Sequence, residues 1–220
     1  VTNRGIDIAS GMDISGNPCV GSSQCSLAAG QQPDANRLDT NTERDNYESA
    51  NNSAELQDIP TINPADYAQK VANLGAAGSG YICRQSGQVQ QGGTCDATTG
   101  LCSGGTVVSA PSGWSCSNGN WEVSSNSAAN GVFYSEGQTK ISGSPGSTAN
   151  PLQATIIARD SIEISGNPNI KPYPTSSDEL KNHLLVTGND LKISGNMKAN
   201  YQNGAILVHQ QFEISGNPEL

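Results

Sequence analysis

Ile164-Ser165-Gly166-Asn167-Pro168 is one of five copies of a short motif in this 220-residue chain, and its repetition decides the predicted fold. The last four copies are separated by 23, 29 and 21 residues, counted between motif isoleucines (141 to 164, 164 to 193 and 193 to 214). Repeats of this length are typical of solenoids, in which each repeat forms one turn and extra residues form loops. The five motif isoleucines are Ile14, Ile141, Ile164, Ile193 and Ile214.

A short apolar run precedes each of the last four copies, and a polar stretch separates it from the motif. One repeat therefore predicts a strand, a turn, a second strand and a Ser-Gly-Asn corner. We expect Gly and Asn to supply the positive φ of a sharp corner, while Pro prevents a helix. The isoleucines should point inward, and the asparagines should form an amide ladder. The apolar runs are 132–134, 156–158, 184–186 and 206–208.

The residues just before the motif isoleucines alternate in sign along the chain: Asp13, Lys140, Glu163, Lys192 and Glu213. In a parallel stack these residues would be neighbours about 4.8 Å apart. Opposite charges at that distance contribute about 0.2–1 kcal/mol per pair. The alternation predicts that the motif strands stack in chain order, with the Ile14 strand beside the Ile141 strand.

The sequence thus predicts an all-β fold, namely a parallel β-helix (β-solenoid) with a large disulfide-stapled insertion that contains one short helix. A β-sandwich is the alternative, but Asn-Pro does not suit two-residue hairpin turns. Residues 1–17 would form the first solenoid strands, residues 18–130 the insertion and residues 131–220 the remaining solenoid turns.

The insertion begins with a polar loop that includes Asp39, Asn41, Glu43 and Asp45. Their spacing resembles that of calcium ligands, but Arg44 stands where an EF-hand loop needs glycine. A solvated loop is therefore preferred to a calcium site. Apart from this Ca²⁺ candidate, we expect no cofactor.

A short helix is predicted over residues 63–75, with Asn63 as N-cap, Pro64 at the first position and Gly75 at the end. One face of this helix is apolar, so we expect it to pack over the solenoid or cover its end. The apolar residues are Tyr67, Val71 and Leu74.

Six cysteines, none in a Cys-x-x-Cys motif, favour disulfides in an oxidising compartment over a metal site. Their connectivity cannot be deduced from sequence. Closing the short loops first would pair Cys19 with Cys25, Cys95 with Cys102, and Cys83 with Cys116.

Four of these cysteines lie in a lobe predicted for residues 80–122, where Asn118-Gly119 indicates a type I′ hairpin turn. Tyr81, Trp114 and Trp121 in the lobe have two interpretations. The preferred one packs the tryptophans on the disulfides, and the other makes the three aromatic residues a recognition surface for sugars or proteins.

The net charge of −9 argues against binding to nucleic acids or to anionic lipid. No catalytic triad or phosphate-binding loop is present. Asp160 and Glu163 come from one repeat, but a solvated face is the preferred interpretation, and we expect no enzymatic activity. No membrane span occurs, and the start at Val1 suggests an ectodomain with a membrane anchor expected upstream.

The stretches Asp58–Tyr67, Gly131–Gly137 and Ile141–Gly146, with the later Ile-Ser-Gly-Asn copies, resemble the surface region of pilus-assembly proteins with a PilX-type N-terminal segment. The resemblance covers about two thirds of the chain. It implies a pilin-like N-terminal helix as anchor and a minor pilin role in type IV pilus assembly, adhesion or aggregation. The family offers no catalytic residues to carry over.

We therefore expect a non-enzymatic extracellular structural or adhesive protein of the bacterial cell surface, associated with type IV pili. Its expected partners are other pilus or surface proteins or surface glycans, not nucleic acid. The alternatives are a surface filament subunit that self-associates through the solenoid ends and a carbohydrate-active β-helix enzyme.

Overall fold

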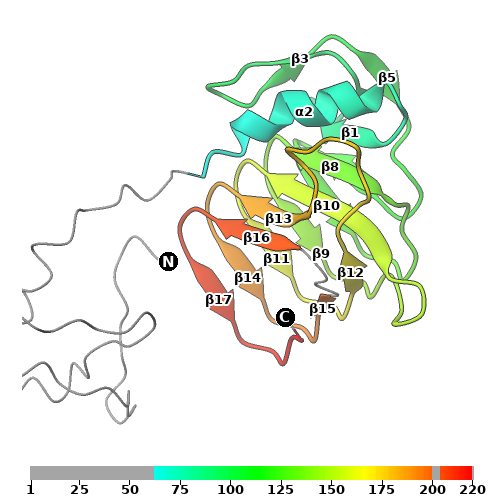
Figure 1. Ribbon diagram of the computed structural model, residues 1–220, viewed down its shortest axis with the longest axis vertical. Helices are drawn as coiled ribbons and strands as arrows, with labels where there is room; N and C mark the ends of the chain where they lie inside the picture. Colours follow the sequence, from blue (N-terminus) through cyan, green and yellow to red (C-terminus); the bar gives the residue numbers. More distant parts are fainter. Residues whose placement is uncertain (1–61, 200–203, 220) are drawn as a thin grey trace, which may run out of the picture. The chain divides into compact units, whose positions relative to one another are not determined.

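The fold is known from a computed structural model that describes residues 62–199 and 204–219, all within the unit Thr61–Leu220. These residues form one helix and 17 strands in three sheets (Figure 1). The elements are α2 (Ala65–Gly75), β1 (Gly80–Cys83), β2 (Val89–Gln91), β3 (Thr94–Cys95), β4 (Cys102–Ser103), β5 (Thr106–Val108), β6 (Ser115–Ser117), β7 (Asn120–Val123), β8 (Gly131–Ser135), β9 (Thr139–Ile141), β10 (Leu152–Ala158), β11 (Ile162–Ile164), β12 (Asn169–Lys171), β13 (His183–Thr187), β14 (Leu191–Ile193), β15 (Lys198–Ala199), β16 (Ala205–Val208) and β17 (Phe212–Ile214).

The two larger sheets mix parallel and antiparallel pairs. In the nine-stranded sheet, β16, β13, β10, β8 and β1 are parallel neighbours, and β2 and β5 follow in antiparallel pairing. The start of β10 also pairs with β12, which pairs with β15. In the six-stranded sheet, β17, β14, β11, β9 and β7 are parallel, and β6 is antiparallel to β7. Strands β3 and β4 form a small separate sheet.

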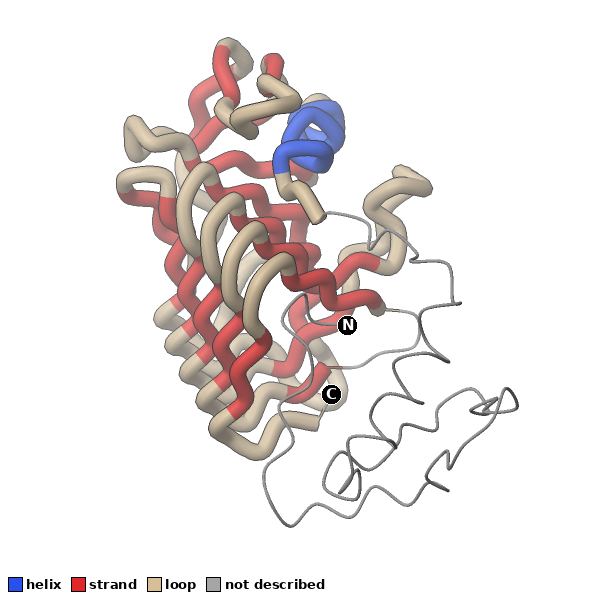
Figure 2. The backbone as a smooth tube through the Cα atoms, turned by 90° about the vertical axis from the view of Figure 1, so that its left-hand side faces the viewer, coloured by secondary structure: helices blue, strands red, loops and turns tan. Residues whose placement is uncertain are grey.

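Four times in succession the chain forms one strand in the nine-stranded sheet and the next strand in the six-stranded sheet (Figure 2). We call each such pair of strands a row, and the rows are β8 with β9, β10 with β11, β13 with β14, and β16 with β17. In each row eight residues separate the apolar centre of the first strand from the motif isoleucine, as from Phe133 to Ile141 or from Ile156 to Ile164. Because this spacing is constant, the same register aligns both sheets at once. Loops of different length absorb the variation between motif copies.

The main hydrophobic core lies between these two sheets. Phe133, Ile156 and Leu185 face it from the nine-stranded sheet, while motif isoleucines such as Ile141 and Ile164 face it from the six-stranded sheet. All five side chains are buried. The predicted inward stack of motif isoleucines is therefore confirmed for the first three described copies.

Helix α2 lies on the outer face of the nine-stranded sheet, where alternate strand residues form a second core. Its Ala68 and Val71 pack with Ile82 of β1 and Tyr134 of β8. The predicted helix is confirmed, although it begins at Ala65 rather than at residue 63. The Asn63 side chain still caps it, since its oxygen accepts the main-chain N–H of Ala65 at 3.1 Å.

This architecture corrects the expected fold class. The β-solenoid prediction is wrong, because the described residues form three sheets, none of them closed or of solenoid form, in a mixed arrangement that resembles a β-sandwich. Hairpins account for the difference, since the β1–β2 and β6–β7 pairs reverse the chain within the large sheets. The lobe predicted at residues 80–122, within an insertion of residues 18–130, joins the large sheets: β1 and β7 are parallel neighbours of β8 and β9.

The predicted alternation of charged residues, which we call the charge ladder, is confirmed for its four described members, but the residue at its start is not the predicted one. Lys140, Glu163, Lys192 and Glu213 occupy neighbouring register positions, with Nζ–Oε distances of 3.7 Å from Lys140 to Glu163 and 3.1 Å from Lys192 to Glu213. Asp13 and Ile14 lie outside the described residues, yet β7 and β11 occupy both sides of β9. The predicted pairing of the Ile14 strand with the Ile141 strand is therefore wrong.

Glu122 of β7 takes the place predicted for Asp13, opposite Lys140. The alternation of sign thus continues through all five strands of the six-stranded sheet that are parallel. Each neighbouring pair favours the observed register over one shifted by a residue, which would turn the charge toward the core.

The motif corners have a different physical basis from the one expected. Gly143, Gly166 and Gly195 do not have positive φ. A Cβ at Gly166 or Gly195 would instead overlap the carbonyl oxygen of the motif glycine in the preceding row. These glycines are therefore required by the close approach of successive main chains.

The asparagines at the same corners form a ladder of a different kind from the predicted amide ladder, because each side chain bonds to the main chain of the next asparagine. The side-chain oxygen of Asn167 accepts the main-chain N–H of Asn196 at 2.8 Å, and that of Asn196 accepts the N–H of Asn217 at 3.3 Å. Each asparagine therefore links its own row to the next, and the oxygen of Asn217 is the last acceptor of the series.

The structure contains the disulfides Cys83–Cys116 and Cys95–Cys102, as the closure of short loops predicted. Cys19 and Cys25 lie outside the described residues. The Asn118-Gly119 turn is also confirmed, because both residues have positive φ (49° and 81°) between the antiparallel strands β6 and β7.

Tyr134 of β8 gives the fold a dependence on alkaline pH. Its hydroxyl donates to the carbonyl of Gly100 at 2.9 Å. Burial raises the pKa of this phenol well above its ordinary value of 10.0; Arg159 partly opposes the shift and Glu136 adds to it. The unfolded chain therefore releases this proton at lower pH than the folded protein does.

We expect the free energy of unfolding to fall as pH rises above 10, by up to about 1.4 kcal/mol per pH unit from this group. Urea titrations at several pH values between 9 and 11 measure the slope. Tyr134→Phe should be less stable at pH 9 but should show a shallower decline. An equal decline in both proteins would show that another group causes it.

Candidate functional site

The aromatic residues considered for recognition form part of the core. Trp121 is 0% exposed and Trp114 is 5% exposed, so neither offers a ring face to a ligand. Both surround Phe133: Trp114 stacks on it with ring centroids 3.6 Å apart, and Trp121 meets it edge-on at 5.6 Å. Tyr81 also stacks on Phe133, with ring centroids 5.5 Å apart, and it is only partly exposed. The alternative interpretation, a recognition surface made by the three aromatic residues, is therefore wrong for the two tryptophans, and the preferred interpretation, in which they are packed inside the protein, agrees with their burial.

Hydrogen bonds of the indole groups explain why tryptophan suits these positions. The Nε1–H of Trp121 donates to the carbonyl of Tyr134 at 2.9 Å, and that of Trp114 donates to the carbonyl of Ala129 at 3.0 Å. Each buried indole thus satisfies its only polar group while filling the core.

Two acidic positions weighed as catalytic candidates have structural partners. Glu163 lies in the charge ladder next to Lys140. The carboxylate of Asp160 is 3.8 Å from Arg159, and its carbonyl accepts the hydroxyl of Thr187. Glu163 also lines a hollow of about 220 Å³ together with Asp190 and Glu213. Glu163 and Glu213 are paired there with Lys140 and Lys192, so they belong to the charge ladder.

Glu136 is a buried carboxylate that the sequence did not reveal. It is 3% exposed, and its oxygens accept the main-chain N–H groups of Gln85 (2.8 Å) and Cys102 (2.6 Å). It therefore holds the turn after β1 and the loop closed by the Cys95–Cys102 disulfide. Both acceptor positions are used by the main chain, which indicates a structural role.

The candidate site is a pair of adjoining hollows that share Gln153 and Lys171 as lining residues. We call this surface the Lys171 groove. One hollow, of about 490 Å³, lies toward Asn130 and Asn150; the other, of about 480 Å³, lies toward Tyr173 and Lys181. Together they lie along the start of β10 and the end of β12.

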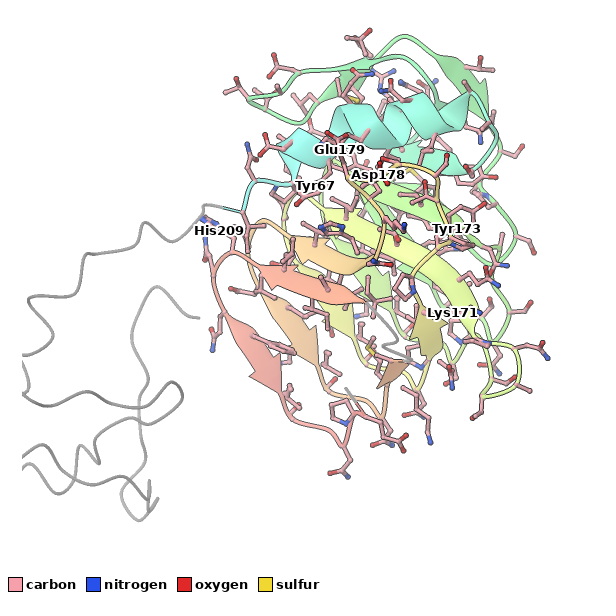
Figure 3. All side chains as sticks on the ribbon, in the orientation of Figure 1. Tyr67, Lys171, Tyr173, Asp178, Glu179 and His209 are labelled. Carbon is pink, nitrogen blue, oxygen red and sulfur yellow. A yellow bond between two sulfur atoms is a disulfide. The ribbon has the colours of Figure 1, made fainter. Side chains whose placement is uncertain are left out.

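The loop of residues 172–182 forms one wall of the groove and is anchored to the rest of the fold. Leu180 is buried in the second core, under α2. Lys70 of α2 binds Glu179 at 3.2 Å, and Figure 3 shows Glu179 beside the helix. The N–H of Tyr173 donates to the Thr155 hydroxyl at 3.3 Å. This wall is therefore held in place without a ligand.

The chemistry of the groove contrasts with that of the whole protein. The chain has a net charge of −9, yet Lys171 and Lys181 line the hollows, and none of their described lining residues is Asp or Glu. Among the described residues, neither lysine takes part in an ion pair. Figure 3 shows Lys171 and Tyr173 on the same side of the molecule.

The remaining lining groups are mainly amides and hydroxyls, together with the Tyr173 ring between Pro172 and Pro174. Amides both donate and accept hydrogen bonds, and the lysines donate only. Such a surface is suited to a polar, negatively charged ligand that carries hydroxyl groups. It supplies neither a nucleophile paired with a base nor a pair of carboxylates for hydrolysis.

One stretch of the sequence could have indicated this groove. Lys171-Pro172-Tyr173-Pro174-Thr175 lies in the longest interval among the last four motif copies, where an extra loop must leave the strands. A tyrosine fixed between two prolines, with a lysine just before them, is suited to a binding surface. The opposing wall, from residues 126–130 and 146–153, carries no comparable sequence signal.

The calcium candidates Asp39, Asn41, Glu43 and Asp45 lie outside the described residues. Within residues 62–199 and 204–219, no three His, Cys, Asp or Glu side chains are grouped as metal ligands would be. In the same part of the chain, no helix has both the length and the apolar character needed to cross a membrane. The two disulfides suggest a secreted or extracellular protein.

Comparisons with protein families, with curated proteins and with solved structures found no match to this chain.

Proposed function

We propose that this protein is a non-enzymatic extracellular protein with a structural and adhesive role, and that it binds acidic glycans through the Lys171 groove. The observation that carries the proposal is the charge of the groove, in a protein of net charge −9: its described lining residues include two lysines outside any described ion pair and no carboxylate. Diffuse attraction of anions is unfavourable for such a protein, so a local cationic site must supply the affinity.

The architecture supports a structural role. The sheets are joined by a disulfide, and their rows are linked by stacked isoleucines, paired charges and asparagines. A scaffold of this kind holds its surface loops in fixed positions. The loop of residues 172–182 is one such loop, and it forms a groove wall.

Association with type IV pili is the finer part of the proposal. It rests on the resemblance of residues 58–67, 131–137 and 141–146 to pilus-assembly proteins with a PilX-type N-terminal segment. The extracellular location suggested by the disulfides agrees with a pilus subunit or a pilus-associated surface protein.

An oligogalacturonate, which carries one carboxylate per sugar, should bind the protein, and a neutral maltooligosaccharide of equal length should bind at least tenfold more weakly. Calorimetric titration at low salt measures both affinities. Lys171→Gln with Lys181→Gln should weaken oligogalacturonate binding tenfold or more, because each lysine supplies a charge-assisted hydrogen bond.

Lys140→Gln with Lys192→Gln is the matched control, since it changes the net charge equally but alters only the charge ladder. It should leave the affinity within twofold of the original. Equal losses in the two double variants, or equal binding of the neutral sugar, would contradict the proposed site.

A further inference from the structure

The outer edge of the last row, formed by β16 and β17, has no neighbouring strand in the described part of the chain. Phe212 is 41% exposed and Ile214 is 47% exposed, whereas their counterparts Leu191 and Ile193 in the preceding row are both 0% exposed. Every inner row is covered by the row after it, and this one is left with apolar side chains in solvent.

The main chain of β17 is also available for hydrogen bonding at this edge. The N–H of Ser215 donates to Ile193, and the carbonyl of Gln211 accepts from Leu191. Because successive residues of a strand direct these groups to opposite sides, those of Phe212 and Ile214 point toward the outer edge. An edge of this kind is a template for another strand.

Charge indicates which strand suits the edge. Glu213 ends the alternating ladder, and Lys192 is its only described neighbour within the ladder. At the corner, Glu219 is likewise paired with a lysine of the preceding row, since its carboxylate lies 2.8 Å from Lys198. A further row would therefore need a basic residue opposite each of these glutamates.

We propose that the β16–β17 edge binds a parallel strand of a partner protein in which a lysine or arginine lies between two apolar residues, followed by a Ser-Gly-Asn corner and a second basic residue. The apolar residues cover Phe212 and Ile214, and the two cations complete the charge pairs of Glu213 and Glu219. The corner asparagine donates its main-chain N–H to the side-chain oxygen of Asn217, as Asn217 itself does to Asn196.

A synthetic copy of residues 190–198 (Asp-Leu-Lys-Ile-Ser-Gly-Asn-Met-Lys) is the probe, because its lysines correspond to Lys192 and Lys198. Labelled with a fluorophore, it should bind the full chain with an anisotropy change that weakens as salt rises. A peptide with glutamate in place of both lysines should bind at least tenfold more weakly. The natural motif of residues 11–18, which has Asp13 at the ladder position, should bind as weakly as the glutamate peptide.

Methylation of peptide nitrogens tests the direction of pairing. In the proposed row, the N–H of the first lysine faces β17 and that of the isoleucine faces away. N-methylation at the lysine should therefore abolish binding, and N-methylation at the isoleucine should change the affinity less than threefold. Equal effects at the two positions, or equal binding of the glutamate peptide, would overturn the proposal.

The protein side has its own control. Glu213→Gln with Glu219→Gln should weaken the lysine peptide about tenfold, while Glu122→Gln, at the opposite end of the ladder, should not. Sedimentation across concentrations identifies the alternative occupant, a second copy of the chain. Dimers that dissociate in the Glu213→Gln, Glu219→Gln variant and exclude the peptide would overturn the assignment to a partner strand.

Discussion

Gly166→Ala is expected to destabilise the protein by about 3 kcal/mol or more, because it forces apart two rows of main chain. A Cβ at this position would overlap the carbonyl oxygen of Gly143 in the preceding row. The main chain there is fixed, since the N–H of Gly166 donates to Ile141 at 3.2 Å. Overpacking usually costs 1–3 kcal/mol when side chains can adjust, and here no side chain can move away.

Urea unfolding followed by tryptophan fluorescence measures this effect, because Trp114 and Trp121 are buried in the core. Gly216→Ala tests the same motif position in the outermost row, which can shift outward, and should cost less than half as much. Gly104→Ala should cost about 1 kcal/mol, since its φ is positive but the space around it is open. Equal losses at all three positions would refute the close-approach explanation.

The motif glycines show where sequence reasoning succeeded and where it failed. The repeated motif with its preceding apolar run predicted which strands are neighbours among the last four copies. The constant eight-residue distance from the apolar run to the motif isoleucine aligns both sheets. The conformation of the glycines was predicted wrongly. Positive φ and close approach both select glycine, and a sequence alone does not distinguish them.

The residue opposite Lys140 at the start of the charge ladder shows a second limit of prediction from sequence. Trp121-Glu122-Val123-Ser124-Ser125-Asn126 has the pattern of Ile162-Glu163-Ile164-Ser165-Gly166-Asn167, with serine in place of the motif glycine and bulkier or smaller apolar residues. This diverged copy provides Glu122 opposite Lys140 and Asn126 as acceptor for Ser144 at 3.2 Å. The Asp13 copy matched the motif better and was therefore preferred as the neighbour.

The Lys171 groove was beyond sequence reasoning for a different reason. Its walls come from loops between strands, at residues 126–130, 146–153 and 171–182. Periodicity places the strands, but it does not determine how loops of unequal length lie against one another. The lysines were visible, yet the absence of carboxylates around them depends on the folded arrangement of all three loops.

Removal of the Cys83–Cys116 disulfide is the second change with a large expected effect. Cys83 lies in β1 of the nine-stranded sheet and Cys116 in β6 of the six-stranded sheet, so this bond joins the two sheets directly. It closes a loop of 33 residues, for which chain entropy predicts about 3.7 kcal/mol of stabilisation. Cys83→Ala with Cys116→Ala should lose this amount and leave a cavity beside Trp121.

Cys95→Ala with Cys102→Ala is the matched control, because this disulfide closes a loop of only 7 residues within the small β3–β4 sheet. The same relation gives about 2.4 kcal/mol for it, and the bond joins no two large elements. Urea unfolding should therefore rank the Cys83, Cys116 double variant as the less stable of the two, with a lower midpoint. The reverse order would show that the loop held by Glu136, and not the link between the sheets, limits the stability of the protein.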